Sequence, residues 1–160
     1  MILIAYDGSE DAKAAIQHAG KLMPGFEATV LSIWEPFTTM LARTPETLRP
    51  LAQVRQAEEI DREETGAAEE RANDGVELAT AAGLDARPLT SALNGSVATT
   101  IIEQADRIDA DAIVVGSRGL TGMALLLGSV SLGVVQNANR TVIIVPSADV
   151  AAEREEALES

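Results

Sequence analysis

The sequence predicts a doubly wound α/β domain, in which helices cover both faces of a parallel sheet. Apolar runs of strand length alternate along the chain with stretches of helical periodicity, so that five strands are separated by four helices. The runs at 1–6 and 112–115 are apolar at nearly every position, which is typical of strands buried on both faces. Right-handed crossovers between such strands place helices on both sides of the sheet.

Length and composition fit one such domain. A chain of 160 residues can bury a sizeable core, and 46% of the residues are hydrophobic. Because the chain has one Trp, one Tyr and two Phe, this core must be aliphatic and rich in alanine. The absence of cysteine excludes disulfides, thiolate catalysis and zinc–thiolate sites. No stretch is long and apolar enough to span a membrane, and the chain starts directly in a strand, so we expect a cytoplasmic protein.

The formal net charge of −13 argues against nucleic acid and membrane surfaces as partners, since both would need basic patches. The same charge opposes the binding of a nucleotide unless backbone amides, a metal ion or Arg118 offset it locally. The only histidine, His18, falls off the apolar face of its helix. We therefore expect it at the surface rather than in a site.

The first strand, 1–6, ends at Asp7-Gly8-Ser9, and Ser9 is a suitable N-cap for the following helix. The apolar positions that share one face of this helix are Ala12, Ala15, Ile16, Ala19 and Leu22. Asp7 could hold a magnesium ion through water, or accept a hydrogen bond from an adenine or ribose. It could equally serve only to organise the turn by bonding to the backbone.

The middle of the chain is predicted to hold a second strand and a long helix. Pro24-Gly25 breaks the first helix, and a strand follows at 28–34. Trp34 could stack on a base, although an isolated tryptophan more often packs under a loop. The chain is irregular to about residue 47 and helical from about 49 to 83, where Gly66 and Gly75 could introduce a kink. The apolar stripe of this helix consists of Ala57, Ile60, Ala67, Ala68, Ala72, Val76 and Ala79.

A short strand at 84–90 leads to Asn94-Gly95-Ser96, where Ser96 is expected to cap the next helix. The inward face of that helix is predicted to consist of Val97, Ile101, Ala105 and Ile108. At the other end of the chain, the segment 148–160 contains several glutamates. We place the domain at 1–147 and expect 148–160 to be a solvated acidic tail, frayed or loosely helical.

Residues 111–147 carry the strongest indication of function. The fourth strand is followed by Gly116-Ser117-Arg118-Gly119, a helix begins near Gly128-Ser129, and a last strand runs over 141–145. Glycine lets another group approach the backbone closely, and a helix N-terminus offers unpaired amides at the positive end of its dipole. A phosphate is the natural occupant of such a loop. Alternatively, the glycines only turn the chain and Ser129 only caps the helix.

The loop resembles the signature of the universal stress protein family. Nucleotide-binding members carry glycine, two residues, glycine, nine residues, and then glycine followed by serine or threonine. This chain has Gly116, two residues, Gly119 and then eight residues before Gly128-Ser129, so its loop is one residue shorter. The stretches ILIAYDGS and IVVGSRGLTG are also similar to the family.

The resemblance implies the strand order 3-2-1-4-5, in which the first and fourth strands meet at the switch point. It also implies a site for ATP or a related adenine nucleotide with Mg²⁺. The phosphates would lie on the glycine loop, Asp7 would contact the ribose or hydrated magnesium, and Ile33 would flank the base. The residues that we expect at this site are Ala5, Asp7, Ile33, Val115, Gly116, Arg118, Gly119, Gly128, Ser129 and Val130.

Two classes of function remain open. The first is a nucleotide-binding regulator that acts on an unidentified protein partner, and the second is an interaction module of the same fold that lost its ligand with the shortened loop. The chain has no Gly-Lys-Ser/Thr phosphate loop and no G-x-G-x-x-G fingerprint after a strand. Because no general base is evident, any ATP hydrolysis should be slow. A homodimer is expected through strand 141–145, which would lie at a sheet edge.

Overall fold

The computed structural model describes residues 1–37, 39, 51–118 and 127–159. Five parallel strands form one sheet in the order β3-β2-β1-β4-β5, which confirms the order implied by the resemblance. In the register of the central strands, Leu3 lies between Thr29 and Ile113. The strands are β1 (Ile2–Ala5), β2 (Glu27–Trp34), β3 (Asp85–Ala92), β4 (Ala112–Gly116) and β5 (Thr141–Val145).

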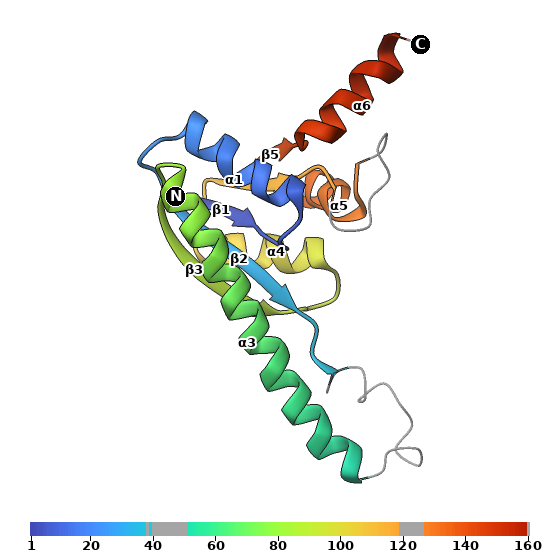
Figure 1. Cartoon of the computed structure of the whole chain (residues 1–160). Coiled ribbons are helices and arrows are strands. Elements are labelled where there is room, and N and C mark those ends of the chain that lie inside the picture. The colour runs from blue at the N-terminus through green and yellow to red at the C-terminus, as the bar shows by residue number, and fades with distance from the viewer. Residues whose placement is uncertain (38, 40–50, 119–126, 160) are drawn as a thin grey trace.

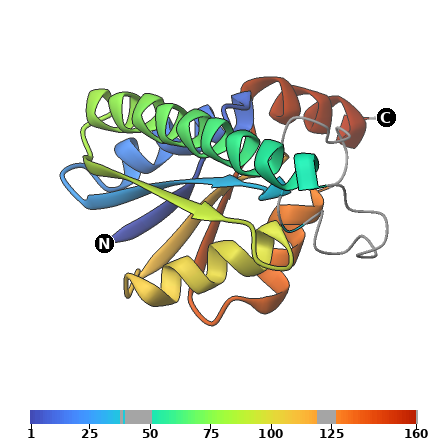
Figure 2. The same ribbon diagram turned by 90° about the horizontal axis from the view of Figure 1, so that it is seen from below.

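Helices cover both faces of the sheet, as expected for the doubly wound class (Figure 1). In Figure 2, α1, α3 and α6 lie on one face, while α4 and α5 lie on the other. The helices are α1 (Glu10–Leu22), α3 (Leu51–Ala81), α4 (Val97–Arg107), α5 (Ser129–Asn137) and α6 (Ala148–Glu159). Among the described residues, no helix combines the length and apolarity that a membrane crossing requires.

The core consists of two aliphatic layers, one on each face of the sheet. Successive residues of β1 point to opposite faces, so Ile4 packs with α1 and α3 while Leu3 packs with α4 and α5. Both side chains are fully buried. Alanines of the helices, such as Ala15 and Ala105, are also fully buried, which lets the helices lie close to the strands. The predicted alanine-rich, aliphatic core is therefore confirmed for the described residues.

Helix α3 is continuous over 31 residues and passes Gly66 and Gly75 without a break. Gly75 has a packing role, because a Cβ added there would lie 2.7 Å from Cγ1 of Val30 and 2.9 Å from Cδ1 of Tyr6. Glycine thus lets the helix approach the sheet closely at this point. The expected irregular segment before the helix falls mostly outside the described residues.

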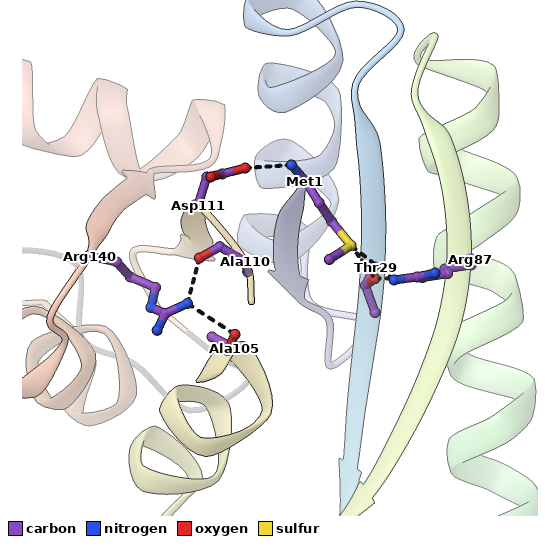
Figure 3. A network of polar contacts seen from close by, with 7 residues as sticks. All are labelled: Met1, Thr29, Arg87, Ala105, Ala110, Asp111 and Arg140. Atoms are coloured by element: carbon purple, nitrogen blue, oxygen red, sulfur yellow. Dashed lines mark hydrogen bonds and ion pairs between the residues drawn. The ribbon is translucent and has the colours of Figure 1, made fainter. Parts of the chain in front are cut away.

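Polar contacts tie together the amino-terminal ends of the strands, as Figure 3 shows. The terminal amine of Met1, just before β1, pairs with the carboxylate of Asp111, just before β4, at 2.6 Å. Arg140, just before β5, donates to the carbonyl oxygens of Ala105 and Ala110 at the end of α4. These contacts lie at the end of the sheet opposite the carboxyl ends of the strands, so they fix the scaffold without entering the cavity described below.

Several expected side-chain positions are wrong. Leu22 is 58% exposed, because it lies in the last turn of α1 next to the exposed Pro24 and Gly25, beyond the buried stripe. Ala67 on α3 is also exposed, and Val97 begins α4 at the rim of the cavity rather than in the core. His18 is exposed, as expected.

The segment 148–160 is not merely a solvated tail. Residues 148–159 form helix α6, and Val150 near its start is completely buried. Asp149, Glu153, Glu155 and Glu156 do face solvent, and Leu158 near the end of the helix is 87% exposed. The charge pattern therefore predicted the exposed face correctly, but one valine holds the first turn of the helix on the domain.

Candidate ligand site at the switch point of the sheet

A cavity of about 510 Å³ lies at the carboxyl ends of β1 and β4, where the strand order reverses. This is the crevice in which open α/β sheets bind their ligands. The wall is formed by the ends of β1, β2 and β4 together with the first turns of α1, α4 and α5. The fold thus brings together segments that are more than 100 residues apart in the sequence.

Nine of the ten residues expected at the site line this one cavity. They are Ala5, Asp7, Ile33, Val115, Gly116, Arg118, Gly128, Ser129 and Val130. The tenth, Gly119, lies outside the described residues. The sequence therefore predicted which residues come together, while their role in binding stays a prediction.

One side of the cavity is apolar. Ile33 and Trp34 lie at the end of β2, and Leu93, Val97 and Ile101 face the same space from the loop after β3 and from α4. Trp34 is half-buried on this wall. A flat aromatic ligand would fit here, because such a group gains most from apolar surface on its faces.

Another part of the wall is formed by the first turn of α5, which begins at Ser129 after the N-cap Gly128. No side chain among the described residues caps this turn. The amide of Gly128 donates to the carbonyl oxygen of Ser117 at 2.8 Å, and Ser131 Oγ donates to the same oxygen at 2.9 Å. An anion at this helix end would therefore use the amides of Ser129 and Val130 rather than that of Gly128.

Asp7 organises the turn after β1 and also lines the cavity. Its Oδ1 accepts a hydrogen bond from the amide of Ser9 at 3.0 Å, which organises the turn into α1. The side chain is exposed and lines the cavity. Among the described residues, no three histidine or acidic side chains converge to form a metal site. One carboxylate still suits Mg²⁺, because this ion is usually held by one or two carboxylates together with the phosphates of a nucleotide.

Asp11 lies beneath the cavity and was missed by the sequence analysis. Its Oδ2 accepts hydrogen bonds from Ser117 Oγ at 2.7 Å and from the amide of Arg118 at 2.9 Å. Burial on its own would raise the pKa of Asp11, but hydrogen bonds from Ser147, Ser117 and the backbone outweigh it and lower the pKa. A carboxylate next to Ala12 in the apolar stripe of α1 is the sequence signal that could have revealed it.

Gly116 has a structural role that is independent of any ligand. A Cβ at this position would lie 2.7 Å from the carbonyl carbon of Asp11 and 3.0 Å from the backbone nitrogen of Ala12. Glycine is therefore required for α1 to approach the end of β4. Part of the glycine pattern is thus explained by packing against α1 and requires no ligand.

Arg118 faces both the cavity and α6. It lines the cavity wall, and its guanidinium lies 3.9 Å from a carboxylate oxygen of Glu153. The Arg118 side chain is 16% exposed and that of Glu153 is 49% exposed. Arg118 is the basic residue of the cavity wall, whereas Asp7 and Glu35 are acidic.

The fold and the cavity together define a doubly wound α/β protein with a cavity at the switch point of its sheet. A family model described as the universal stress protein family matches residues 1–146. The chain is 32% identical to a universal stress protein of Methanocaldococcus jannaschii, covering 90% of this chain and 80% of that one. It is 34% identical to one of Thermus aquaticus, covering 90% and 96%. The chain belongs to the universal stress protein family.

Solved structures of the family share the fold. UspA from Lactobacillus plantarum superposes with a TM-score of 0.68 at 22% identity, covering 90% of this chain and 95% of that one. A universal stress protein from Archaeoglobus fulgidus in complex with dAMP gives 0.57 at 21% identity, covering 90% and 95%. One from Arabidopsis thaliana with AMP bound gives 0.59 at 19% identity, covering 92% of each chain.

Proposed function

We propose that this protein binds an adenine nucleotide, of the ATP type, in the cavity at the switch point and acts as a ligand-dependent regulator. The observation that carries the proposal is the lining of the cavity, which combines an apolar wall with an uncapped helix N-terminus. A nucleotide has the same division into a flat base and a phosphate chain. Structures of relatives in complex with dAMP and with AMP support this class of ligand.

In the proposed complex the base lies against Ile33 and Trp34, and the phosphates lie on the amides of Ser129 and Val130. Arg118 supplies positive charge beside them, which matters in a chain of net charge −13. Asp7 contacts the ribose or a hydrated Mg²⁺ ion. Because the phosphates rest mainly on amides, binding depends on the backbone of α5 more than on charged side chains.

The alternative is an interaction module of the same fold without a ligand. Two observations favour it, since the Gly128 amide is already engaged by Ser117 and Gly116 is required for packing against α1. The shorter spacing in the sequence points the same way. Both functions require the same fold, so only a binding measurement separates them.

Mass spectrometry of small molecules released from the denatured protein tests the proposal directly. We expect an adenine nucleotide, or, if the site empties during purification, heat of binding when ATP and Mg²⁺ are added to the dialysed protein. A protein that releases no nucleotide and shows no heat with ATP at millimolar concentration would instead be the ligand-free module.

We further propose that two copies associate through β5. This strand lies at the edge of the sheet, and its central residues Val142, Ile143 and Ile144 are only partly buried. An exposed apolar edge strand promotes pairing with another strand, and pairing across a two-fold axis would cover it.

A further inference from the structure

Helix α6 follows the part of the chain that the family model matches, yet it is anchored beside the cavity. Val150 is completely buried, and its amide faces Ser147 Oγ at 3.5 Å. Ser147, just before the helix, is itself buried and lies close enough to Asp11 to help lower the pKa of its carboxyl group. Asp11 in turn accepts from Ser117 and Arg118 of the loop after β4. A continuous set of contacts therefore connects α6 with the cavity wall.

The side chain of Arg118 joins these two parts. Arg118 belongs to the cavity wall, and its guanidinium lies 3.9 Å from a carboxylate oxygen of Glu153, in the second turn of α6. A guanidinium has several N–H donors and a fixed positive charge, so a carboxylate and a phosphate can both approach it. The two anions repel each other, however, and each reduces the attraction that the other gains from the same cation.

We infer that α6 regulates the phosphate end of the cavity, with Glu153 acting through Arg118 to weaken the binding of anionic ligands. This inference rests on the proposed function, because it concerns the phosphates of the nucleotide placed there. Glu153 is a positioning residue in this arrangement, since it touches Arg118 and not the ligand. By thermodynamic linkage, a nucleotide whose phosphates interact with Arg118 weakens the docking equilibrium of α6 by the same factor.

The expected size follows from the exposure of the pair. Exposed ion pairs change equilibria only modestly, so the loss of the Glu153 charge should tighten ATP binding by roughly two- to fivefold. Adenosine has the same base and ribose but no phosphate, and its affinity should not change. The effect on ATP should also shrink as salt rises, because the ions screen partly exposed charges.

The test compares Glu153→Gln with Glu155→Gln, which removes the same charge from an exposed position of the same helix. Calorimetry with ATP and with adenosine, at low and high salt, gives the affinities of the parent and both variants. Hydrogen exchange of the α6 amides, with and without ATP, reports the docking of the helix. We expect Glu153→Gln alone to tighten ATP binding, and ATP to speed exchange in α6 of the parent.

The results distinguish a failure of the role proposed for Glu153 from a failure of nucleotide binding itself. If the parent binds ATP but the two variants behave alike, or if adenosine changes as much as ATP, the role of Glu153 is refuted while the proposed function stands. If the parent binds neither ATP nor adenosine, the proposed function fails and the coupling fails with it. In that case, faster hydrogen exchange of α6 in ligand-free Glu153→Gln than in Glu155→Gln would show that the contact between Glu153 and Arg118 only helps to hold α6 in place.

Discussion

Asp11 shows how a single buried carboxylate can organise the floor of the cavity. It is 6% exposed, and its Oδ2 accepts hydrogen bonds from Ser117 and Arg118 of the loop after β4. Ser147, from the loop after β5, also helps to lower its pKa. A charged group in such a place is stabilising only while it stays ionised and fully hydrogen-bonded. The lowered pKa of Asp11 indicates that these hydrogen bonds outweigh the cost of burial.

Replacing Asp11 by Asn should therefore destabilise the protein by roughly 2 kcal/mol at neutral pH, the value of hydrogen bonds to a charged group. Because the pKa of Asp11 is lower in the folded state, its contribution is complete above the ordinary aspartate value and is lost as the pH falls through the lowered pKa. Urea unfolding at pH 7 and pH 3 checks this, with Asp85→Asn at an exposed site as the control. An equal difference at both pH values would contradict the account.

Gly116 and Gly66 form a matched pair for testing the packing role of glycine. Alanine at Gly116 should destabilise the fold by roughly 1–3 kcal/mol, because its Cβ would collide with the backbone of α1. Alanine at Gly66 meets no atom within 4 Å and should stabilise α3 by up to about 1 kcal/mol. Thermal unfolding of the parent and both variants measures these two changes in stability. Equal effects of the two substitutions would show that the close approach at Gly116 is unimportant.

At the scale of the elements, helix α6 shows what the sequence could not reveal. Its composition correctly predicts an acidic, exposed surface, but the burial of Val150 depends on a neighbour that only the folded chain supplies. Periodicity failed in the same way at Leu22, which continues the apolar stripe of α1 but extends past the surface that buries it. By contrast, the caps at Ser9 and Ser96 are local, and the structure confirms both.

Docking of α6 should depend on Val150. Shortening it to alanine removes two buried methylene equivalents, worth roughly 1.6 kcal/mol. Hydrogen exchange in α6 should become faster, while Leu158→Ala, at a position that is 87% exposed, should leave exchange in its first turns unchanged. If exchange in α6 were as slow in Val150→Ala as in the parent, this valine would not be what holds the helix.

The edge strand β5 leads to a prediction about assembly. A lysine in place of Ile143 should weaken the proposed dimer, because a charge at the centre of an edge strand opposes pairing with a second copy. Light scattering over a dilution series gives the mass of the parent and the variant. Val135→Lys serves as a control, since it adds the same charge at an exposed position of α5. A parent that is monomeric at every concentration would refute the dimer.

For the whole molecule, the sequence predicted the strand order and the position of the cavity better than its detailed chemistry. Buried apolar runs and the resemblance to the family were sufficient for these, because topology depends on the coarse pattern of elements. The contacts of Asp11 and of Arg118 could not be predicted, since each joins segments that are distant in the sequence. Gly119 and the shorter spacing that follows it fall at 119–126, outside the described residues.

Two substitutions at Ser129 test the claim that backbone amides hold a phosphate at α5. Ser129 is the first residue of the helix, where proline is well tolerated, and Gly128 before it has φ −62° and ψ 154°, as a residue preceding proline requires. Ser129→Ala removes only the hydroxyl, whereas Ser129→Pro also removes the amide. Glu10→Pro, at the equivalent position of α1 after Ser9 with φ −67° and ψ 160°, is the control for folding.

The most direct measurement is calorimetric titration of these variants and the parent with ATP and Mg²⁺. We expect the parent to bind, Ser129→Ala to lose about 1 kcal/mol, and Ser129→Pro to lose clearly more, because a charged acceptor loses a further donor. Adenosine should bind equally to all of them. If Ser129→Pro binds ATP as tightly as Ser129→Ala, or if the parent binds no nucleotide at all, the first turn of α5 does not hold a phosphate and the central claim is wrong.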